Sequence, residues 1–315
     1  MSGQFFVLFA ILFTGYFLRK SKFIDGKMNE GVNKFVCYFA YPCLLVKNIG
    51  SLSMNGTLVR EFLLMAGLTA VLYVIYSAYA YFYAKARHFP KRISNVAELA
   101  MASSNDGFMG FPITLIFFGE KGLFLMMAHN VALNTFYFTY GLIVLRRNNE
   151  GKNKSGAKEV LSIIGKVLLN PNILGIVLGF VLTFAGVSLD NAFGSYLSLM
   201  GNVATPMAMI FIGSTLAESN FIEMFRNRIV WEASINKLII LPLITALAVW
   251  FLPVSPMIKA TLILGCCFPA GATVSMLAQQ EKQNEEMASK ILFLTTMASI
   301  VTIPLSMYMV NLWLL

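Results

Sequence analysis

The apolar stretch Ile93–Phe118 is interrupted near its middle by residues that could bind a ligand. The interruption consists of small, polar and helix-breaking residues, namely Ser103, Ser104, Asn105, Asp106, Gly107, Gly110 and Pro112. Inside a bilayer, non-helical backbone is tolerated only where protein or a water-filled cavity covers it. A helix broken at mid-membrane is therefore a sequence indication of a transport site.

A second interruption lies in the apolar stretch Met257–Gln279, where Pro269 is followed by small residues. If the two broken helices cross, half-helices that begin after Pro112 and after Pro269 expose N–H groups with partial positive charge. Such helix ends favour a carboxylate. We therefore expect a small organic anion, bound by Ser103, Ser104, Asn105, Asp106, Gly107, Pro112, Asn130, Asn134, Pro269, Ala270, Gly271 and Thr273. Kinks and close helix packing are the alternative explanation of each proline or glycine.

Asp106 is the first candidate for coupling, because an ionisable side chain this deep in a membrane is costly and usually functional. Its carboxylate either carries a proton or cation, or caps the second half-helix. Glu98 and His129 are the other coupling candidates. Glu98 could instead extend toward the membrane surface, and His129 could instead bond to another helix.

Two further features of the polar residues bear on the site. Asn130 and Asn134 are one helical turn apart on a single face. Lys237 lies inside the apolar stretch Ile229–Leu252, and we expect its ammonium to extend toward the membrane surface, with a fixed countercharge inside the protein as the alternative. The cysteines Cys37, Cys43, Cys266 and Cys267 show no metal-ligand spacing, so neither a metal nor a cofactor is expected.

The composition indicates that these helices lie in a membrane. Hydrophobic residues make up 57% of the 315 residues and charged residues only 12%, far below the quarter typical of soluble domains. The fold class expected is an all-α polytopic membrane protein with ten transmembrane helices. The ten stretches are Gln4–Leu18, Val32–Leu52, Phe62–Ala84, Ile93–Phe118, Leu123–Leu145, Pro171–Val187, Phe193–Leu216, Ile229–Leu252, Met257–Gln279 and Met287–Leu314.

The charge pattern predicts orientation. Most of the 24 lysine and arginine residues fall in the connections on one side of the ten stretches. The positive-inside rule makes that side cytoplasmic, with both termini outside the cytoplasmic membrane. Because the cationic residues are spread over these connections, no nucleic-acid partner is expected. The expected partners are the small organic anion and the lipid bilayer, and a homodimer is allowed.

The longest polar connection divides the chain into two halves. Residues 1–147 and 170–315 each hold five stretches, and residues 148–169 form a cytoplasmic linker with an interfacial helix. An odd number of spans per half makes the second half inverted relative to the first. The broken helices, spans 4 and 9, then occupy matching positions as crossover helices.

The run Asn105–Pro112 resembles the Asn-x-Gly-Phe-x-Gly-x-Pro signature of the auxin efflux carrier family, and the runs Asn170–Ile173 and Pro269–Gln279 are similar to its sixth and ninth spans. The resemblance covers essentially the whole chain. It implies the ten-span fold of bile-acid sodium symporters, with a scaffold domain and a crossover domain that move relative to each other. It also implies that substrate binds where Asn105 and Pro269 mark the crossing. Asp106 departs from the pattern, because the family has a small uncharged residue there.

The expected function is secondary active transport of a small carboxylate, such as a dicarboxylate or an auxin-like weak acid, by alternating access. A sodium-coupled symporter of the bile-acid type and a non-transporting sensor or channel remain alternatives. No enzyme is expected. The aspartates are Asp25, Asp106 and Asp190, and only Asp106 lies in a span, so a paired-aspartate protease cannot be built.

Overall fold

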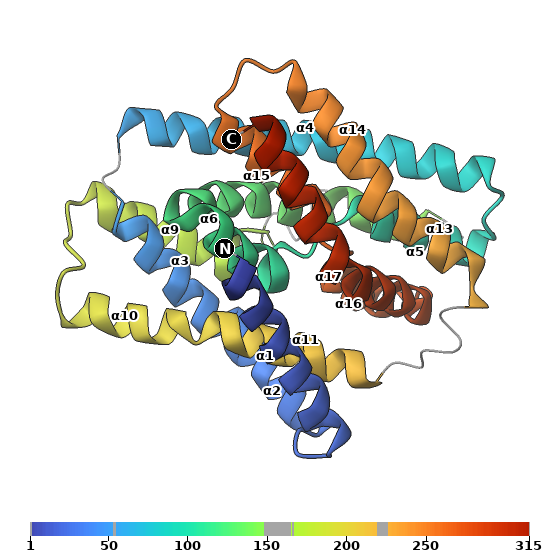
Figure 1. Ribbon diagram of the computed structural model, residues 1–315, viewed down its shortest axis with the longest axis horizontal. Coiled ribbons are helices and arrows are strands. Elements are labelled where there is room, and N and C mark those ends of the chain that lie inside the picture. The colour runs from blue at the N-terminus through green and yellow to red at the C-terminus, as the bar shows by residue number, and fades with distance from the viewer. Residues whose placement is uncertain (1, 53–54, 148–164, 166, 219–225, 315) are drawn as a thin grey trace. The chain divides into compact units, whose positions relative to one another are not determined.

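The computed structural model describes residues 2–52, 55–147, 165, 167–218 and 226–314, and these ranges contain helices and no strand (Figure 1). The first half holds α1 (Ser2–Lys20), α2 (Gly26–Phe35), η1 (Val36–Ala40), α3 (Tyr41–Gly50), α4 (Gly56–Ala86), α5 (Lys91–Ala102), η2 (Asp106–Gly110), α6 (Phe111–Phe136), η3 (Tyr137–Gly141) and α7 (Leu142–Arg146). The second half holds α9 (Pro171–Phe184), α10 (Ala192–Asn202), α11 (Ala204–Glu218), α13 (Arg228–Ile235), η4 (Asn236–Ile240), α14 (Leu241–Trp250), α15 (Pro256–Cys267), α16 (Ala272–Gln280) and α17 (Glu285–Leu314). The η elements are π-helical turns.

Each apolar stretch predicted from the sequence contains helix. Among the described residues, five helical runs are long and apolar enough to cross a membrane alone, namely Gly56–Ala86, Lys91–Arg146, Ala192–Ala217, Arg228–Trp250 and Glu285–Leu312. The pair α15 and α16, bent by 52° at its break, makes a sixth. The helical fold class is therefore confirmed for the described residues, with five or six candidate membrane spans. Ten spans and the inverted relation of the halves stay predictions.

Three π-helical turns in the described residues precede a proline at the second position of the next helix. Pro42 follows η1, Pro112 follows η2, and Pro242 follows η4. Proline has no N–H to donate, and its ring crowds the carbonyl four residues earlier. In each case that carbonyl lies inside the π turn, whose wider coil gives the ring room. The helices therefore continue past these prolines.

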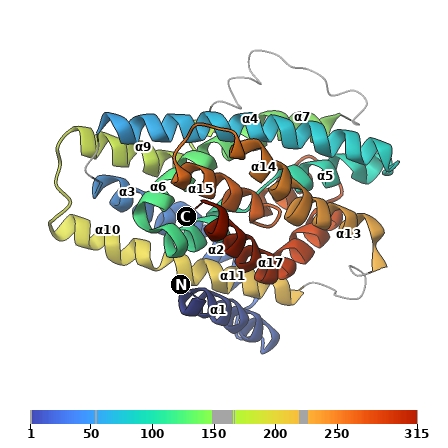
Figure 2. The same ribbon diagram turned by 45° about the horizontal axis from the view of Figure 1, so that its top comes forward.

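The chain forms two compact units, each drawn from both halves of the sequence. The first comprises residues 1–63, 107–128 and 166–219. Within it, α1 packs against α11, and Figures 1 and 2 both show the two helices next to each other. A Cβ added at Gly15 would lie 2.3 Å from the carbonyl oxygen of Ile210, and one at Gly213 only 1.8 Å from that of Leu12. Glycine permits this backbone approach, as is common between membrane helices.

The second unit comprises residues 64–106, 129–165 and 220–315 and contains both helix breaks. Its C-terminal helix α17 contacts α5, α13, α15 and α16. The polar residues Thr295, Thr296 and Ser299 of α17 are buried, and each donates to a carbonyl three or four residues earlier. These three hydroxyl groups are therefore satisfied without solvent.

The predicted linker, residues 148–169, lies almost wholly outside the described residues. The compact units do not follow the sequence halves 1–147 and 170–315, because each unit combines helices from both. This division concerns packing and leaves open whether the halves are inverted repeats, so the halves stay a prediction.

Candidate functional site

The two helix breaks meet within the second unit. Ser103, which ends α5, accepts a hydrogen bond through its Oγ from the backbone N–H of Gly271 at 3.1 Å. Ser104 donates through its Oγ to the carbonyl of Gly265 in α15 at 2.8 Å. Both serines are fully or almost fully buried. The first break is thus bonded to both sides of the second, as expected for crossing broken helices.

Glycine is required where these backbones approach. A Cβ added at Gly271 would lie 1.8 Å from the hydroxyl oxygen of Tyr137 and 2.6 Å from the carbonyl oxygen of Ser104. Tyr137 is buried and donates to that same carbonyl at 2.9 Å. A Cβ at Gly265 would lie 2.7 Å from Nε2 of His129. The helix carrying His129 and Tyr137 therefore packs directly against the crossing.

The half-helix α16 begins after Pro269, as the sequence predicts, with Gly271 in an extended cap conformation. However, the first N–H groups of the break are already bonded. The N–H of Ala270 donates to Oγ1 of Thr295 at 3.1 Å, and that of Gly271 donates to Ser103. The exposed amides that the sequence predicts are therefore the N–H groups of Ala272 and Thr273 in the first turn of α16. N–H groups in the first turn of a helix have no acceptor within the helix.

The other half-helix begins earlier than expected. The prediction placed its N-terminus after Pro112, but helical structure resumes at Asp106, and Pro112 is a buried residue in the first turn of α6. The reason is the π turn η2, which accommodates the ring of Pro112. A second interruption follows at Gly119, where φ is +63° and the chain turns toward the predicted fifth stretch. Gly107 and Pro112 belong to the first unit.

Asp106 and His129 form a buried hydrogen bond. The carboxylate Oδ2 lies 2.6 Å from Nδ1 of the imidazole, and both side chains are almost completely buried. The second oxygen, Oδ1, is buried without a hydrogen-bond partner among the described residues. No capping bond from Asp106 to a backbone N–H is found there, so capping of the half-helix is the wrong reading. His129 bonds to another helix, which was its alternative prediction.

Lys237 corrects the expectation that its ammonium extends toward the membrane surface. The side chain is only 1% exposed and lies within η4. It lies close enough to Asp106, Cys266 and Cys267 to interact with them electrostatically. A cation buried in protein needs a compensating negative charge. Asp106 is the carboxylate among the groups that act on Lys237, although no ion pair joins the two among the described residues. Packing inside the second unit therefore overrides the tendency of lysine to reach water.

The amides beside the crossing differ in how they are bonded. Asn134 donates through Nδ2 to the backbone oxygen and to Oδ1 of Asn130, at 2.8 and 2.9 Å, which confirms their common face. Asn105 is 5% exposed, yet its side chain makes no hydrogen bond to another described residue. A buried amide without a protein partner is an available ligand for a polar solute.

Glu98 lies in α5, near the start of the helical run Lys91–Arg146, rather than at the crossing. Its carboxylate is fully buried and accepts from Arg147 at 2.7 Å and from Tyr140 at 3.0 Å. Arg146 forms a parallel ion pair with Glu281 at 2.7 Å. These contacts bind α5, α7 and α16 together within the unit.

Sequence reasoning missed three residues that shape the crossing. Tyr137 and Thr295 give no motif signal, because a buried hydroxyl on a membrane helix is common. The contact of Gly265 with the His129 ring also has no counterpart in the spacing. Each role depends on which helices meet, and only the three-dimensional packing reveals that.

The chain resembles known transporters over nearly its whole length. A family model described as "Membrane transport protein" matches residues 1–307. A Rhizobium meliloti protein named "Putative malonate transporter" is 24% identical over 323 residues, covering 99% of this chain and 96% of the relative. An "Uncharacterized transporter" of Methanothermobacter thermautotrophicus is 23% identical over 297 residues, covering 94% and 93%. The chain belongs to this membrane transport family, which confirms the resemblance to auxin efflux carriers.

Proposed function

We propose that this member of the membrane transport family is a secondary active transporter of a small organic anion. The substrate class is a short carboxylate, and malonate is the first candidate because one relative is named for it. The anion binds at the helix crossing of the second unit. Alternating access then exposes the crossing to each side of the membrane in turn.

The observation that carries the proposal is the bonding of the two breaks. Ser103 and Ser104 bond to Gly271 and Gly265, so the residue before α16 lies against the break that carries the unbonded amide of Asn105. The N–H groups of Ala272 and Thr273 and the Asn105 amide are neutral donors suited to a carboxylate. Asn130, Asn134 and Pro269, which belong to the same unit, complete the proposed site.

Asp106 and His129 are proposed as the coupling pair. Their side chains lie 2.6 Å apart, close enough for a proton to pass from one to the other. Lys237 balances the Asp106 charge when His129 is neutral. Proton uptake by the pair makes the site more positive, which favours an entering anion, and proton release favours its departure. Glu98, whose carboxylate forms an ion pair with Arg147, is proposed to stabilise the unit rather than to take part in coupling.

The membrane placement belongs to the same proposal. We place the chain in the cytoplasmic membrane as ten spans, with the arginine- and lysine-rich connections in the cytoplasm and both termini outside. Four of the ten predicted stretches do not lie within a helical run long and apolar enough to cross a membrane alone. In this proposal they cross as broken, bent or short spans. A thin local bilayer suits α1 and the 14-residue α9.

Counterflow in proteoliposomes tests the proposal. Vesicles that contain the purified protein and unlabelled malonate should accumulate labelled malonate transiently from a dilute external pool. Dicarboxylates should compete, whereas the uncharged diamide of malonate should not. Asn105→Ala should reduce the initial rate at least tenfold, whereas Asn33→Ala, an amide in α2 outside the site, should leave it unchanged.

The controls separate the alternatives. Omitting sodium should leave counterflow intact, and a sodium requirement would favour the bile-acid-type symporter. Binding of malonate without counterflow would favour a sensor. If no carboxylate among mono-, di- and aromatic acids shows counterflow or binding, the anion assignment is wrong.

A further inference from the structure

A charged pocket of about 450 Å³ lies in the second unit, away from the helix crossing. The segment that follows α4 contributes Arg87 and His88, and the start of α13 contributes Arg226, Asn227, Arg228 and Glu232. Glu232 is the one acidic residue among those lining it, so three arginines face a single carboxylate. The pocket therefore has an excess of positive charge.

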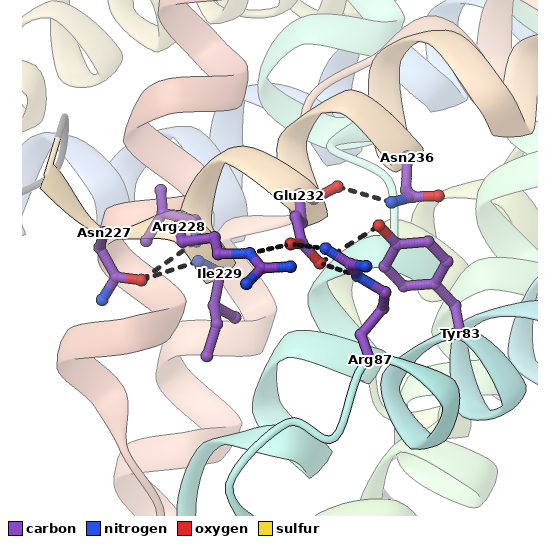
Figure 3. Close-up of polar contacts among 8 residues, drawn as sticks. Tyr83, Arg87, Asn227, Arg228, Ile229, Glu232 and Asn236 are labelled. Carbon is purple, nitrogen blue, oxygen red and sulfur yellow. Dashed lines mark hydrogen bonds and ion pairs between the residues drawn. The ribbon is translucent and has the colours of Figure 1, made fainter.

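Glu232 holds two of the arginines in place (Figure 3). Arg87 donates through Nη2 to Oε1 at 2.7 Å and through Nε to Oε2 at 3.0 Å. Arg228 donates through Nε to Oε1 at 2.6 Å, and Tyr83 donates to Oε2 at 3.2 Å. The contacts use two of the three nitrogen atoms of Arg87 and one of those of Arg228. The remaining guanidinium edges are held near one another before any ligand arrives.

The pocket stays cationic under all ordinary conditions. The hydrogen bond to Glu232 raises the pKa of the Arg87 guanidinium, so this residue keeps its charge. Arg226 and Arg228 are both exposed, and Arg226 has no described acidic partner. Asn227 caps α13 by accepting from the N–H groups of Ile229 and Val230. The positive end of the helix dipole thus adds to the arginine charges.

The helical run Arg228–Trp250 gives the depth of the pocket in a bilayer. Large apolar side chains are exposed along one stripe of it at every fourth position, namely Trp231, Ile235, Ile239, Leu243 and Leu247. Trp250, at the far end, is also exposed. Tryptophan prefers membrane interfaces, and 19 residues of helix separate Trp231 from Trp250 by about 28 Å, close to the thickness of the hydrocarbon core. Arg228, one turn before Trp231, then lies at the level of lipid headgroups.

We propose that the arginine pocket binds the phosphate of an anionic phospholipid from the surrounding leaflet. Guanidinium groups recognise phosphate through paired hydrogen bonds, and phosphates of lipids are the anions present at this depth. The acyl chains of such a lipid would lie along the exposed stripe of α13 and α14. Glu232 both orients the arginines and competes with the phosphate for them.

Binding of short-chain phosphatidylglycerol to the purified full-length protein in a neutral detergent tests the proposal. Titration calorimetry should show a saturable site that short-chain phosphatidylcholine does not fill. Arg226→Gln and Arg228→Gln should each weaken binding roughly fivefold. Glu232→Gln should tighten binding, because the phosphate then meets no competing carboxylate. Arg92→Gln, the same change outside the pocket, should alter the affinity less than twofold.

Two outcomes of this titration would overturn the proposal. Competition by inorganic phosphate at concentrations similar to the lipid would identify a site for a soluble phosphate and overturn the lipid assignment. Equal losses in Arg226→Gln and Arg92→Gln would show general surface attraction and overturn the pocket. Arg226 is exposed, so its variant tests the pocket even if Glu232→Gln fails to fold.

Discussion

Replacing Gly271 by alanine should damage the helix crossing more than any other single methyl addition at this site. The new Cβ would overlap the Tyr137 hydroxyl at 1.8 Å and the Ser104 carbonyl at 2.6 Å. Overpacking of a tight core costs about 1–3 kcal/mol. Displacing the Tyr137 hydroxyl also breaks its 2.9 Å bond to Ser104, which adds about 1 kcal/mol. We therefore expect a loss of about 2–4 kcal/mol in the free energy of unfolding.

The assay is unfolding by sodium dodecyl sulfate in mixed micelles, followed by tryptophan fluorescence. Tyr137→Phe removes the hydroxyl that the new methyl meets, so the double variant Gly271→Ala/Tyr137→Phe should lose at least about 1 kcal/mol less than the sum of the single variants. Gly67→Ala is the matched control, because no atom lies within 4 Å of its added Cβ. If Gly271→Ala is as harmless as Gly67→Ala, or if the double variant is additive, the packing described for the crossing is wrong.

Three further predictions concern charge and packing. Asp106→Asn should lower malonate counterflow at least tenfold in proteoliposomes, because the amide cannot carry the coupling proton; counterflow at the wild-type rate would remove Asp106 from coupling. Glu98→Gln should cost about 1–2 kcal/mol in unfolding because the Arg147 guanidinium loses its buried carboxylate, with counterflow kept in the surviving protein. Gly213→Ala should destabilise the first unit by about 2 kcal/mol or more, since its Cβ would lie 1.8 Å from the carbonyl oxygen of Leu12, and unchanged unfolding would contradict the α1 to α11 contact.

Helix positions and both breaks were predictable from the sequence. A membrane forces backbone groups into helices, so apolar length and charged boundaries locate each one. Mid-span proline beside small polar residues likewise marks where helices are interrupted. After the first break, the sequence predicted that the helix resumes after Pro112, whereas it resumes at Asp106. Composition gives no sign of the π turn that precedes the proline.

The partners of the buried charged groups were not predictable in the same way. Asp106 and His129 are separated by 23 positions, and Lys237 joins them from another part of the chain. Hydropathy places each residue within a span but does not determine its rotation toward a neighbour. Lys237 was therefore expected at the membrane surface, although packing buries it beside the aspartate.

The central claim is that the crossed breaks hold a carboxylate. A thermal-unfolding screen of short-chain dicarboxylates and aromatic weak acids against the purified protein tests this claim most directly. At least one carboxylate should raise the unfolding temperature of the wild type and of Asn33→Ala, and Asn105→Ala should abolish the rise. Equal stabilisation of Asn105→Ala by the same acid would contradict the site.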